Sequence, residues 1–88
     1  MGLWQKLLGK DDADDVEFIR KYTTLDTTPI GEVTQKFEVY RAKSERQARA
    51  YLATRMVSDP RVRVVVETPE GAFTKDVRGV HGPFASNI

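Results

Sequence analysis

His81 is the only histidine in this 88-residue chain, and histidine is the side chain that most readily moves protons near neutral pH. It lies between Gly79 and Gly82, where a flexible backbone could present the ring to a substrate. A general base needs an orienting partner, and Asp76 is the nearest acid in the sequence. No nucleophile motif or second ligand accompanies this pair. We therefore interpret His81 as an exposed residue at the end of a sheet, and we predict no catalytic residue and no enzyme activity.

Acidic residues gather in the segment DDADD, residues 11–15. Clustered carboxylates can bind a divalent cation, but this segment lacks the glycine and the terminal glutamate of a calcium loop. The chain has no cysteine and no glycine-rich phosphate-binding motif. The sequence therefore predicts no metal site and no cofactor, and it places these acids at the solvated start of a helix.

Basic residues concentrate between residues 41 and 63, a segment that contains seven basic residues and only two acidic ones. They are Arg41, Lys43, Arg46, Arg49, Arg55, Arg61 and Arg63. Such a set could follow a phosphate backbone, so nucleic-acid binding is our alternative function. Residues 1–40 carry eight acids against five bases, however, and could neutralise this charge within the chain. The net charge of +1 and the absence of a run of stacking aromatics favour a solvated charged surface.

The opening segment MGLWQKLLGK is amphipathic. On a short helix it places four apolar residues on one side: Leu3, Trp4, Leu7 and Leu8. Two lysines make a weak membrane-surface anchor, and the myristoylation pattern fails at Lys6. We therefore expect this side to contact a partner or the chain's own domain. No run approaches the roughly 20 apolar residues of a membrane span, no signal peptide is recognisable, and cysteine is absent, so we expect a cytoplasmic protein.

The middle of the chain has a clear hydrophobic pattern. Alternation in VTQKFEVYRA predicts a strand over residues 34–42. Ser44 stands three residues before Gln47, the spacing of a capping box, which predicts a helix over residues 45–56. We expect Arg46, Arg49 and Arg55 to project outward and the buried stripe to hold Ala48, Tyr51, Leu52 and Met56. The segment RVRVVVET predicts a second strand.

The segment TPEG, residues 68–71, predicts a turn. Pro69 presets φ at the first corner, and Gly71 can adopt the left-handed conformation. The segment AFTKDV then predicts a return strand over residues 72–77. The strongest strand of the chain is therefore expected in a hairpin.

Two registers of this hairpin remain open. A three-residue loop with a bulge at the glycine pairs Val66 with Thr74 and directs three residues away from the helix: Val65, Phe73 and Val77. A four-residue loop pairs Thr68 with Phe73 instead, and turns Phe73 and Lys75 toward the helix. Turn geometry favours the first register, in which the second face of the sheet needs a cover.

Together these elements predict an α+β fold: a small β-α-β-β sheet with its first two strands parallel and one main helix on one face. Residues 13–22 fit either a fourth, N-terminal strand or a short helix, and residues 23–32 have the composition of a loop. We expect an amphipathic segment over residues 1–12, a single domain over residues 13–82 and a tail over residues 83–88.

The segment VVVETPEGAFTKDVRGVH, with the upstream KSERQARAYLATR, resembles a pattern of small uncharacterised bacterial proteins. That pattern has a helix with paired alanines, a valine strand, ETPEG, a short strand, and D-x-x-G-[IV] followed by an aromatic residue. The resemblance covers residues 36–81, and His81 departs from the expected aromatic residue. It implies no activity and leaves residues 1–32 unexplained.

We therefore interpret the chain as a small binding or accessory module that contacts a protein partner or a second copy of itself. The expected contact residues are Leu3, Trp4, Leu7, Leu8, Val65, Phe73 and Val77.

Overall fold

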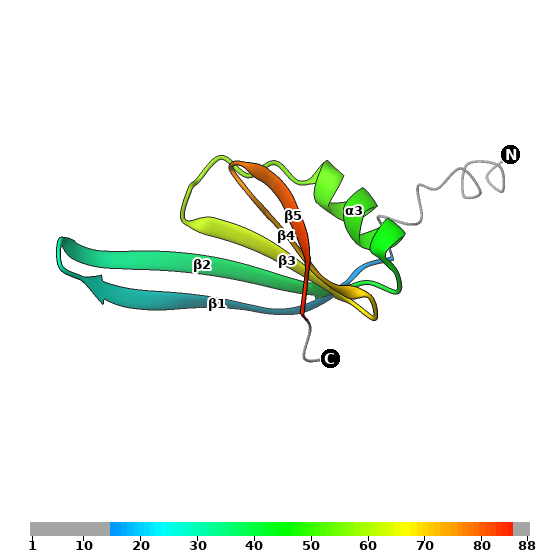
Figure 1. Cartoon of the computed structure of the whole chain (residues 1–88), viewed down its shortest axis with the longest axis horizontal. Helices are drawn as coiled ribbons and strands as arrows, with labels where there is room; N and C mark the ends of the chain where they lie inside the picture. Colours follow the sequence, from blue (N-terminus) through cyan, green and yellow to red (C-terminus); the bar gives the residue numbers. More distant parts are fainter. Residues whose placement is uncertain (1–14, 86–88) are drawn as a thin grey trace, which may run out of the picture.

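The computed structural model describes residues 15–85. These residues form a mixed sheet of five strands arranged in chain order, with one helix on one face (Figure 1). The elements are β1 (Glu17–Thr28), β2 (Gly31–Arg41), α3 (Glu45–Thr54), β3 (Val62–Thr68), β4 (Gly71–Asp76) and β5 (Gly79–Phe84). β2 and β3 are parallel, and the other neighbouring strands are antiparallel. The α+β class is confirmed, but the sheet has five strands rather than three or four.

The N-terminal third forms a long hairpin. β1 begins at Glu17, so residues 17–22 of the undecided segment 13–22 form a strand. The prediction of a loop over residues 23–32 is wrong, because only Pro29 and Ile30 turn the chain and their neighbours pair across β1 and β2. Threonine is common here, and its branched side chain suits a pleated strand.

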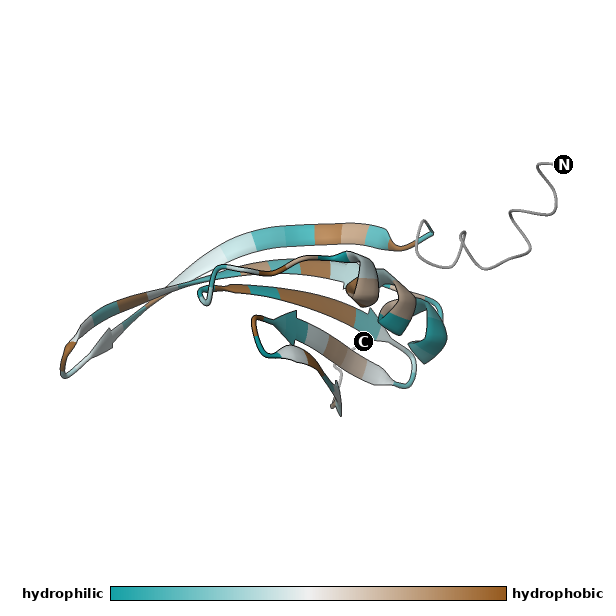
Figure 2. Cartoon of the chain, turned by 90° about the horizontal axis from the view of Figure 1, so that it is seen from above, coloured by the Kyte–Doolittle hydropathy of each residue, from teal (hydrophilic) through white to brown (hydrophobic). Residues whose placement is uncertain are grey.

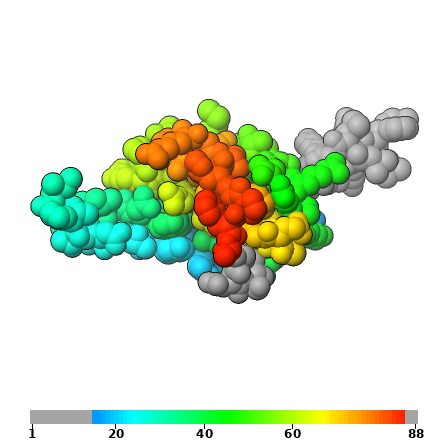
Figure 3. Space-filling model, in the orientation of Figure 1, coloured from blue at the N-terminus to red at the C-terminus, as the bar shows by residue number. Residues whose placement is uncertain are grey.

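The tip of this hairpin extends beyond the rest of the sheet. β2 pairs with β3 only from Lys36 onward, which leaves residues 24–35 as a two-stranded ribbon, here called the arm. The arm projects at the left of Figures 1 and 3, and the molecule measures 57 × 27 × 20 Å. It exposes large apolar side chains at Leu25, Ile30 and Val33. A two-stranded ribbon is at best marginally stable alone in water, so contact with another surface would stabilise the arm.

The helix crosses between the two parallel strands, and its predicted cap is confirmed. The Gln47 backbone N–H donates to the Ser44 hydroxyl at 3.2 Å, and the Gln47 side-chain oxygen accepts from the Lys43 N–H at 2.6 Å. The helix ends at Thr54, two residues earlier than predicted. Met56 therefore lies outside the buried stripe and is 93% exposed.

The core lies between the helix and the middle of the sheet. Ala48 and Leu52 of α3 pack against Val64, Val66 and Phe73, and all five side chains are fully buried. The apolar middle of β3 is visible as a brown stretch close to the helix in Figure 2.

The β3–β4 hairpin adopts neither predicted register. Thr68 pairs with Gly71 and Val66 with Phe73, so the loop has only two residues. The Thr68 hydroxyl donates to the Gly71 carbonyl at 2.7 Å and accepts from the Glu70 N–H at 3.0 Å, which closes the turn without a bulge. Compared with the favoured register, this pairing turns Phe73 to the helix face, where its ring is fully buried.

The same turn chemistry closes the β1–β2 hairpin. The Thr28 hydroxyl donates to the Gly31 carbonyl at 2.6 Å and accepts from the Ile30 N–H at 3.3 Å. The pattern T-P-x-G thus occurs twice, at residues 28–31 and 68–71. A threonine that takes the N–H two residues ahead stabilises a tight turn. This repeat is the sequence signal that distinguishes the first hairpin from a loop.

The β3–β4 hairpin also holds both ends of the helix. Glu70 accepts from the backbone N–H of Glu45 at 2.8 Å. Lys75 donates to the carbonyl oxygens of Leu52 at 2.8 Å and Arg55 at 2.6 Å. A negative charge at the helix start and a positive charge at its end are the signs that the helix dipole favours. The last turn of α3 has no basic residue, so Lys75 supplies that charge from the sheet.

The C-terminal segment is a strand that passes close to β4. β5 extends to Phe84, beyond the expected domain boundary at residue 82, and contains a cis peptide bond between Gly82 and Pro83. A Cβ atom at Gly82 would lie 2.8 Å from the Ala72 carbonyl oxygen and 2.9 Å from the Phe73 ring. Glycine is therefore required at this crossing.

Candidate protein-interaction surface

The predicted contact residues do not form one patch. The first four, Leu3, Trp4, Leu7 and Leu8, lie outside the described residues. Val65 is half-buried on the face opposite the helix, here called the open face, and Val77 is 46% exposed in the β4–β5 turn. Phe73 is buried under α3, so its assignment as a contact residue is wrong. The error follows from the loop length, since a shift of one residue exchanges the faces of a strand.

The open face nevertheless carries apolar side chains. Tyr22 stacks on Phe37 with ring centres 4.9 Å apart, and the Arg20 guanidinium lies 5.5 Å from the centre of the Tyr22 ring. Val39, beside Val65 in the register, is only 2% exposed. The open face is thus partly apolar where β1, β2 and β3 lie together.

Carboxylates accompany at least five of the seven basic residues proposed to contact phosphate. The ion pairs are Lys43–Asp15 at 3.0 Å, Arg49–Glu45 at 2.7 Å, Arg55–Glu38 at 2.8 Å, Arg61–Asp59 at 3.2 Å and Arg63–Asp76 at 3.6 Å. Arg41 and Arg46 are exposed. Arg55 turns toward the helix side of the sheet, whereas Arg63 belongs to the open face with Val65. These residues therefore do not form one continuous basic stripe.

Arg55 is the centre of a polar cluster between α3 and β2, and its predicted outward orientation is wrong. It donates to Glu38 at 2.8 Å and to the hydroxyl groups of Tyr40 at 2.9 Å and Tyr51 at 2.7 Å. The Tyr40 hydroxyl in turn donates to Glu38 at 2.9 Å. A helix that ends at Thr54 leaves Arg55 in extended backbone geometry, from which its side chain reaches the sheet.

The cluster changes the acidity of its members. Burial raises the pKa of Tyr40 to about 12, and the Tyr51 hydrogen bond adds to this effect. Burial alone would raise the pKa of Glu38, but hydrogen bonds from Arg55 and Tyr40 hold it below its ordinary value. The pKa of Arg55 rises because these hydrogen bonds outweigh its burial. All these groups keep their ordinary charge at neutral pH, so the cluster is suited to structure rather than proton transfer.

His81 and Asp76 lie together on the open face. The His81 Nε2 atom is 3.2 Å from one Asp76 carboxylate oxygen, and this oxygen also accepts from the Arg78 N–H at 2.8 Å. The Arg78 N–H, with His81 and Arg63, lowers the pKa of Asp76. This geometry provides an oriented imidazole, the first requirement of a general base. Neither cavity described below is lined by His81.

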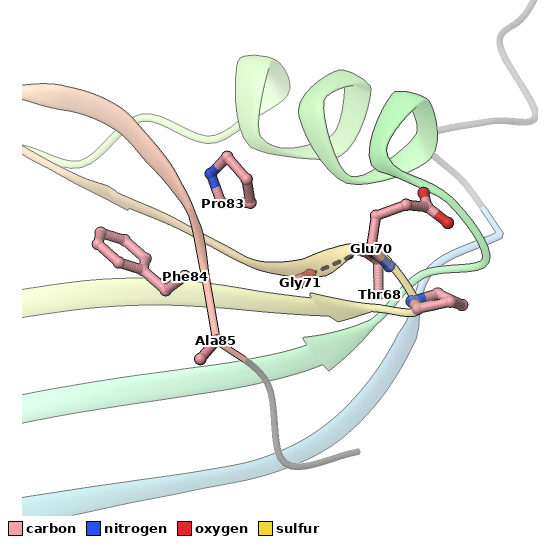
Figure 4. Close-up of a pocket in the computed structure, with 7 residues that line it drawn as sticks. Thr68, Glu70, Gly71, Pro83, Phe84 and Ala85 are labelled. Carbon is pink, nitrogen blue, oxygen red and sulfur yellow. Dashed lines mark hydrogen bonds between the residues drawn. The ribbon is translucent and has the colours of Figure 1, made fainter.

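The described part of the chain contains at least two cavities. The larger, of about 350 Å³, lies where the end of β5 passes the β3–β4 turn (Figure 4). It is lined by Thr68, Pro69, Glu70, Gly71, Pro83, Phe84 and Ala85. Its one carboxylate, Glu70, already caps the helix. The smaller cavity, of about 170 Å³, adjoins the Glu38–Arg55 ion pair. The larger cavity lacks the convergent polar groups of a small-molecule site, and the smaller one, although charged residues line it, is below the roughly 300–1,000 Å³ of such sites.

The two edges of the sheet differ in their capacity to accept another strand. β5 is short, has an irregular pairing with β4, and includes Pro83, which has no N–H to donate. After an irregularity next to Phe18, β1 runs without interruption or proline from Arg20 to Thr28. No strand among residues 15–85 covers the outer side of β1. Sequence reasoning missed this edge because it treated residues 23–32 as a loop.

The pairing with β2 determines which backbone groups point outward from β1. Thr28 and Gly31 flank a two-residue turn and form a hydrogen-bonded pair, so hydrogen-bonded pairs recur at every second residue from there. The backbone groups of the intervening residues face away from β2: Lys21, Thr23, Leu25 and Thr27. With respect to the other described residues, β1 thus presents a regular row of unpaired donors and acceptors at its outer edge.

No family model, curated protein or solved structure matches this chain. Within residues 15–85, no cluster of three or more histidine, aspartate or glutamate side chains is placed to hold a metal ion. No helix in that stretch combines the length and the apolar character needed to cross a membrane.

Proposed function

We propose that this protein is a non-catalytic protein-interaction module that binds a partner by strand addition at the outer edge of β1. The observation that carries this proposal is the uninterrupted edge from Arg20 to Thr28, half of which lies on the projecting arm. An extended segment of a partner can satisfy such a row of backbone groups.

The contrast between the two edges supports this choice. Proteins protect sheet edges with prolines, bulges, inward charges or short strands, because an open edge invites pairing. β5 has a proline, a short length and an irregular pairing, whereas β1 has one irregularity near its start. The longer edge is therefore the more available one.

Side chains along β1 favour a protein partner. Tyr22 and Leu25 are 38% and 60% exposed, and the strand contains four threonines. Aromatic and β-branched residues gain most from cross-strand neighbours. The strand carries charges of both signs, a pattern that suits a protein surface better than a polyanion.

A strand probe would test this function without knowledge of the natural partner. The probe is a nine-residue peptide that alternates threonine and valine and carries lysine at each end. In amide NMR spectra of the full chain, we expect its addition to shift the outward amides of Lys21, Thr23, Leu25 and Thr27 most strongly. Shifts confined to β5 or to the β3–β4 cavity would contradict the proposal, as would the absence of any shift in a sample that is monomeric.

A proline variant provides the matched control. The N–H of Thr23 points outward, so Thr23→Pro removes a donor from the free edge while leaving the hydrogen bonds to β2. We expect this variant to keep the circular dichroism spectrum of the parent and to lose the peptide-induced shifts. Unchanged peptide binding by a folded Thr23→Pro variant would exclude the outer edge of β1.

A further inference from the structure

We propose that the natural occupant of the β1 edge is β1 of a second copy, paired antiparallel about a two-fold axis at Thr23. This inference rests on the proposed function, and it adds the identity of the partner and the register. The resulting dimer would have one continuous sheet of ten strands. Its evidence is the self-complementarity of β1.

Symmetry limits the registers that two copies can adopt. The two-fold axis that relates neighbouring antiparallel strands is perpendicular to the sheet, so each residue pairs with a residue of the same face. On β1 the open-face residues are Arg20, Tyr22, Thr24 and Asp26, opposite Val39, Phe37, Gln35 and Val33 of β2. The other face holds Lys21, Thr23, Leu25 and Thr27. The axis must therefore pass through a residue of β1, not between two residues.

The register centred on Thr23 brings opposite charges together. It places Arg20 directly opposite the partner's Asp26, and symmetry repeats this pair at the other end of the interface. A centre at Thr24 instead places Arg20 opposite the partner's Thr28, and a centre at Tyr22 places it opposite the partner's Thr24. Within the uninterrupted stretch from Arg20 to Thr28, opposite charges face each other only when the axis lies at Thr23, and such cross-strand pairs stabilise a sheet.

The side chains of Arg20 and Asp26 are available to form an ion pair across the proposed interface. Within residues 15–85, neither Arg20 nor Asp26 has an ion-pair partner, and both side chains are exposed. The Arg20 guanidinium is held over the Tyr22 ring, on the face where the partner's Asp26 would lie. Their availability contrasts with the paired state of most basic residues between positions 41 and 63.

The remaining pairs in this register are compatible. Thr23 meets its own symmetry copy, and Tyr22 meets the partner's Thr24, an aromatic residue beside a β-branched one. Leu25 lies opposite the partner's Lys21, whose aliphatic stem can cover it. The helix packs on β3, β4 and β5, so it does not obstruct the β1 edge. Pairing would also support the arm along its exposed side.

Charge reversal with rescue tests the register. Sedimentation equilibrium of the full chain should show a monomer–dimer equilibrium. Arg20→Asp and Asp26→Arg should each weaken dimerisation at least about tenfold, because each places like charges opposite one another twice. The double variant, Arg20→Asp with Asp26→Arg, should restore the dimer. Glu32→Arg, on β2 of the same arm, is the control and should leave dimerisation unchanged.

Each outcome of these measurements supports or contradicts the self-pairing of β1 in this register. Single variants that dimerise like the wild type, or a folded double variant that stays monomeric, would overturn this register. A wild type that stays monomeric up to NMR concentrations would overturn self-pairing altogether. If the threonine–valine peptide still shifts the outward β1 amides in that monomer, the proposed function stands without this partner. If the peptide also fails to bind, both proposals are wrong.

Discussion

At the scale of single residues, Arg55 connects the end of α3 to β2. Its guanidinium donates to one carboxylate and two phenol oxygens, and the side chain is mostly buried. A buried charge is tolerated only where such partners surround it. Arg55 therefore determines the distance between the helix end and β2 rather than contributing to a nucleic-acid surface.

The Tyr40 phenol should make stability fall at high pH. Its pKa is about 12 in the folded protein and near 10 in the unfolded chain. Because the unfolded chain loses this proton first, the stabilisation is complete below pH 10 and disappears as the pH rises from 10 to 12. Urea unfolding should show this decline in the wild type and a smaller one in Tyr40→Phe. Equal declines in both proteins would show that Tyr40 is not the group responsible.

At the scale of elements, two tight T-P-x-G turns organise two of the three hairpins, and the β3–β4 hairpin also clamps the helix. Its turn brings Glu70 to the helix start, and its strand brings Lys75 to the helix end. The close crossing of β5 at Gly82 then packs the edge of the sheet against Phe73. The helix, the hairpin and β5 should therefore unfold together.

Two alanine substitutions separate this packing from backbone strain. Gly82 and Gly79 have similar positive φ values, 133° and 123°, but a Cβ atom at Gly79 would meet nothing within 4 Å. Gly79→Ala should cost about 1–2 kcal/mol from the left-handed backbone alone. Gly82→Ala should cost about 1–3 kcal/mol more, because the new methyl group overpacks against Ala72 and Phe73. Equal losses in chemical denaturation would indicate that β5 does not pack closely on β4.

At the scale of the whole molecule, charge is distributed in local pairs while the apolar surface extends along the arm. At least five of the seven basic residues from 41 to 63 have carboxylate partners. The exposed large apolar side chains of the arm are Leu25, Ile30 and Val33. This distribution favours protein contact over phosphate contact.

Oligonucleotide titration would check this preference. We expect labelled single- and double-stranded oligonucleotides to show only weak, non-saturating binding at low salt, since most basic side chains between residues 41 and 63 already pair with acids. Tight binding that weakens steeply as salt is added would instead indicate several phosphate contacts and favour the nucleic-acid alternative.

The sequence by itself determined those elements that depend only on residues close together in the chain. The Ser44–Gln47 cap, the valine strand and the presence of a turn at Pro69 depend on neighbouring residues, and the structure confirms all three. The T-P-x-G repeat is also local, and it would have identified the first hairpin. Side-chain hydrogen bonds within four residues form in the same way wherever the segment lies.

Only the tertiary structure decided three features: the register of the β3–β4 hairpin, the orientation of the Arg55 side chain and the unpaired edge of β1 among the described residues. Phe73 could face either side until the Thr68 turn fixed the loop at two residues and the helix covered the ring. Arg55 could point to solvent until Glu38 and Tyr40 met it from β2, far away in the chain. Among residues 15–85 the outer edge of β1 is unpaired because the sheet places β3 on the other side of β2. Each of these outcomes depends on contacts between residues distant in sequence, which periodicity and turn propensity do not encode.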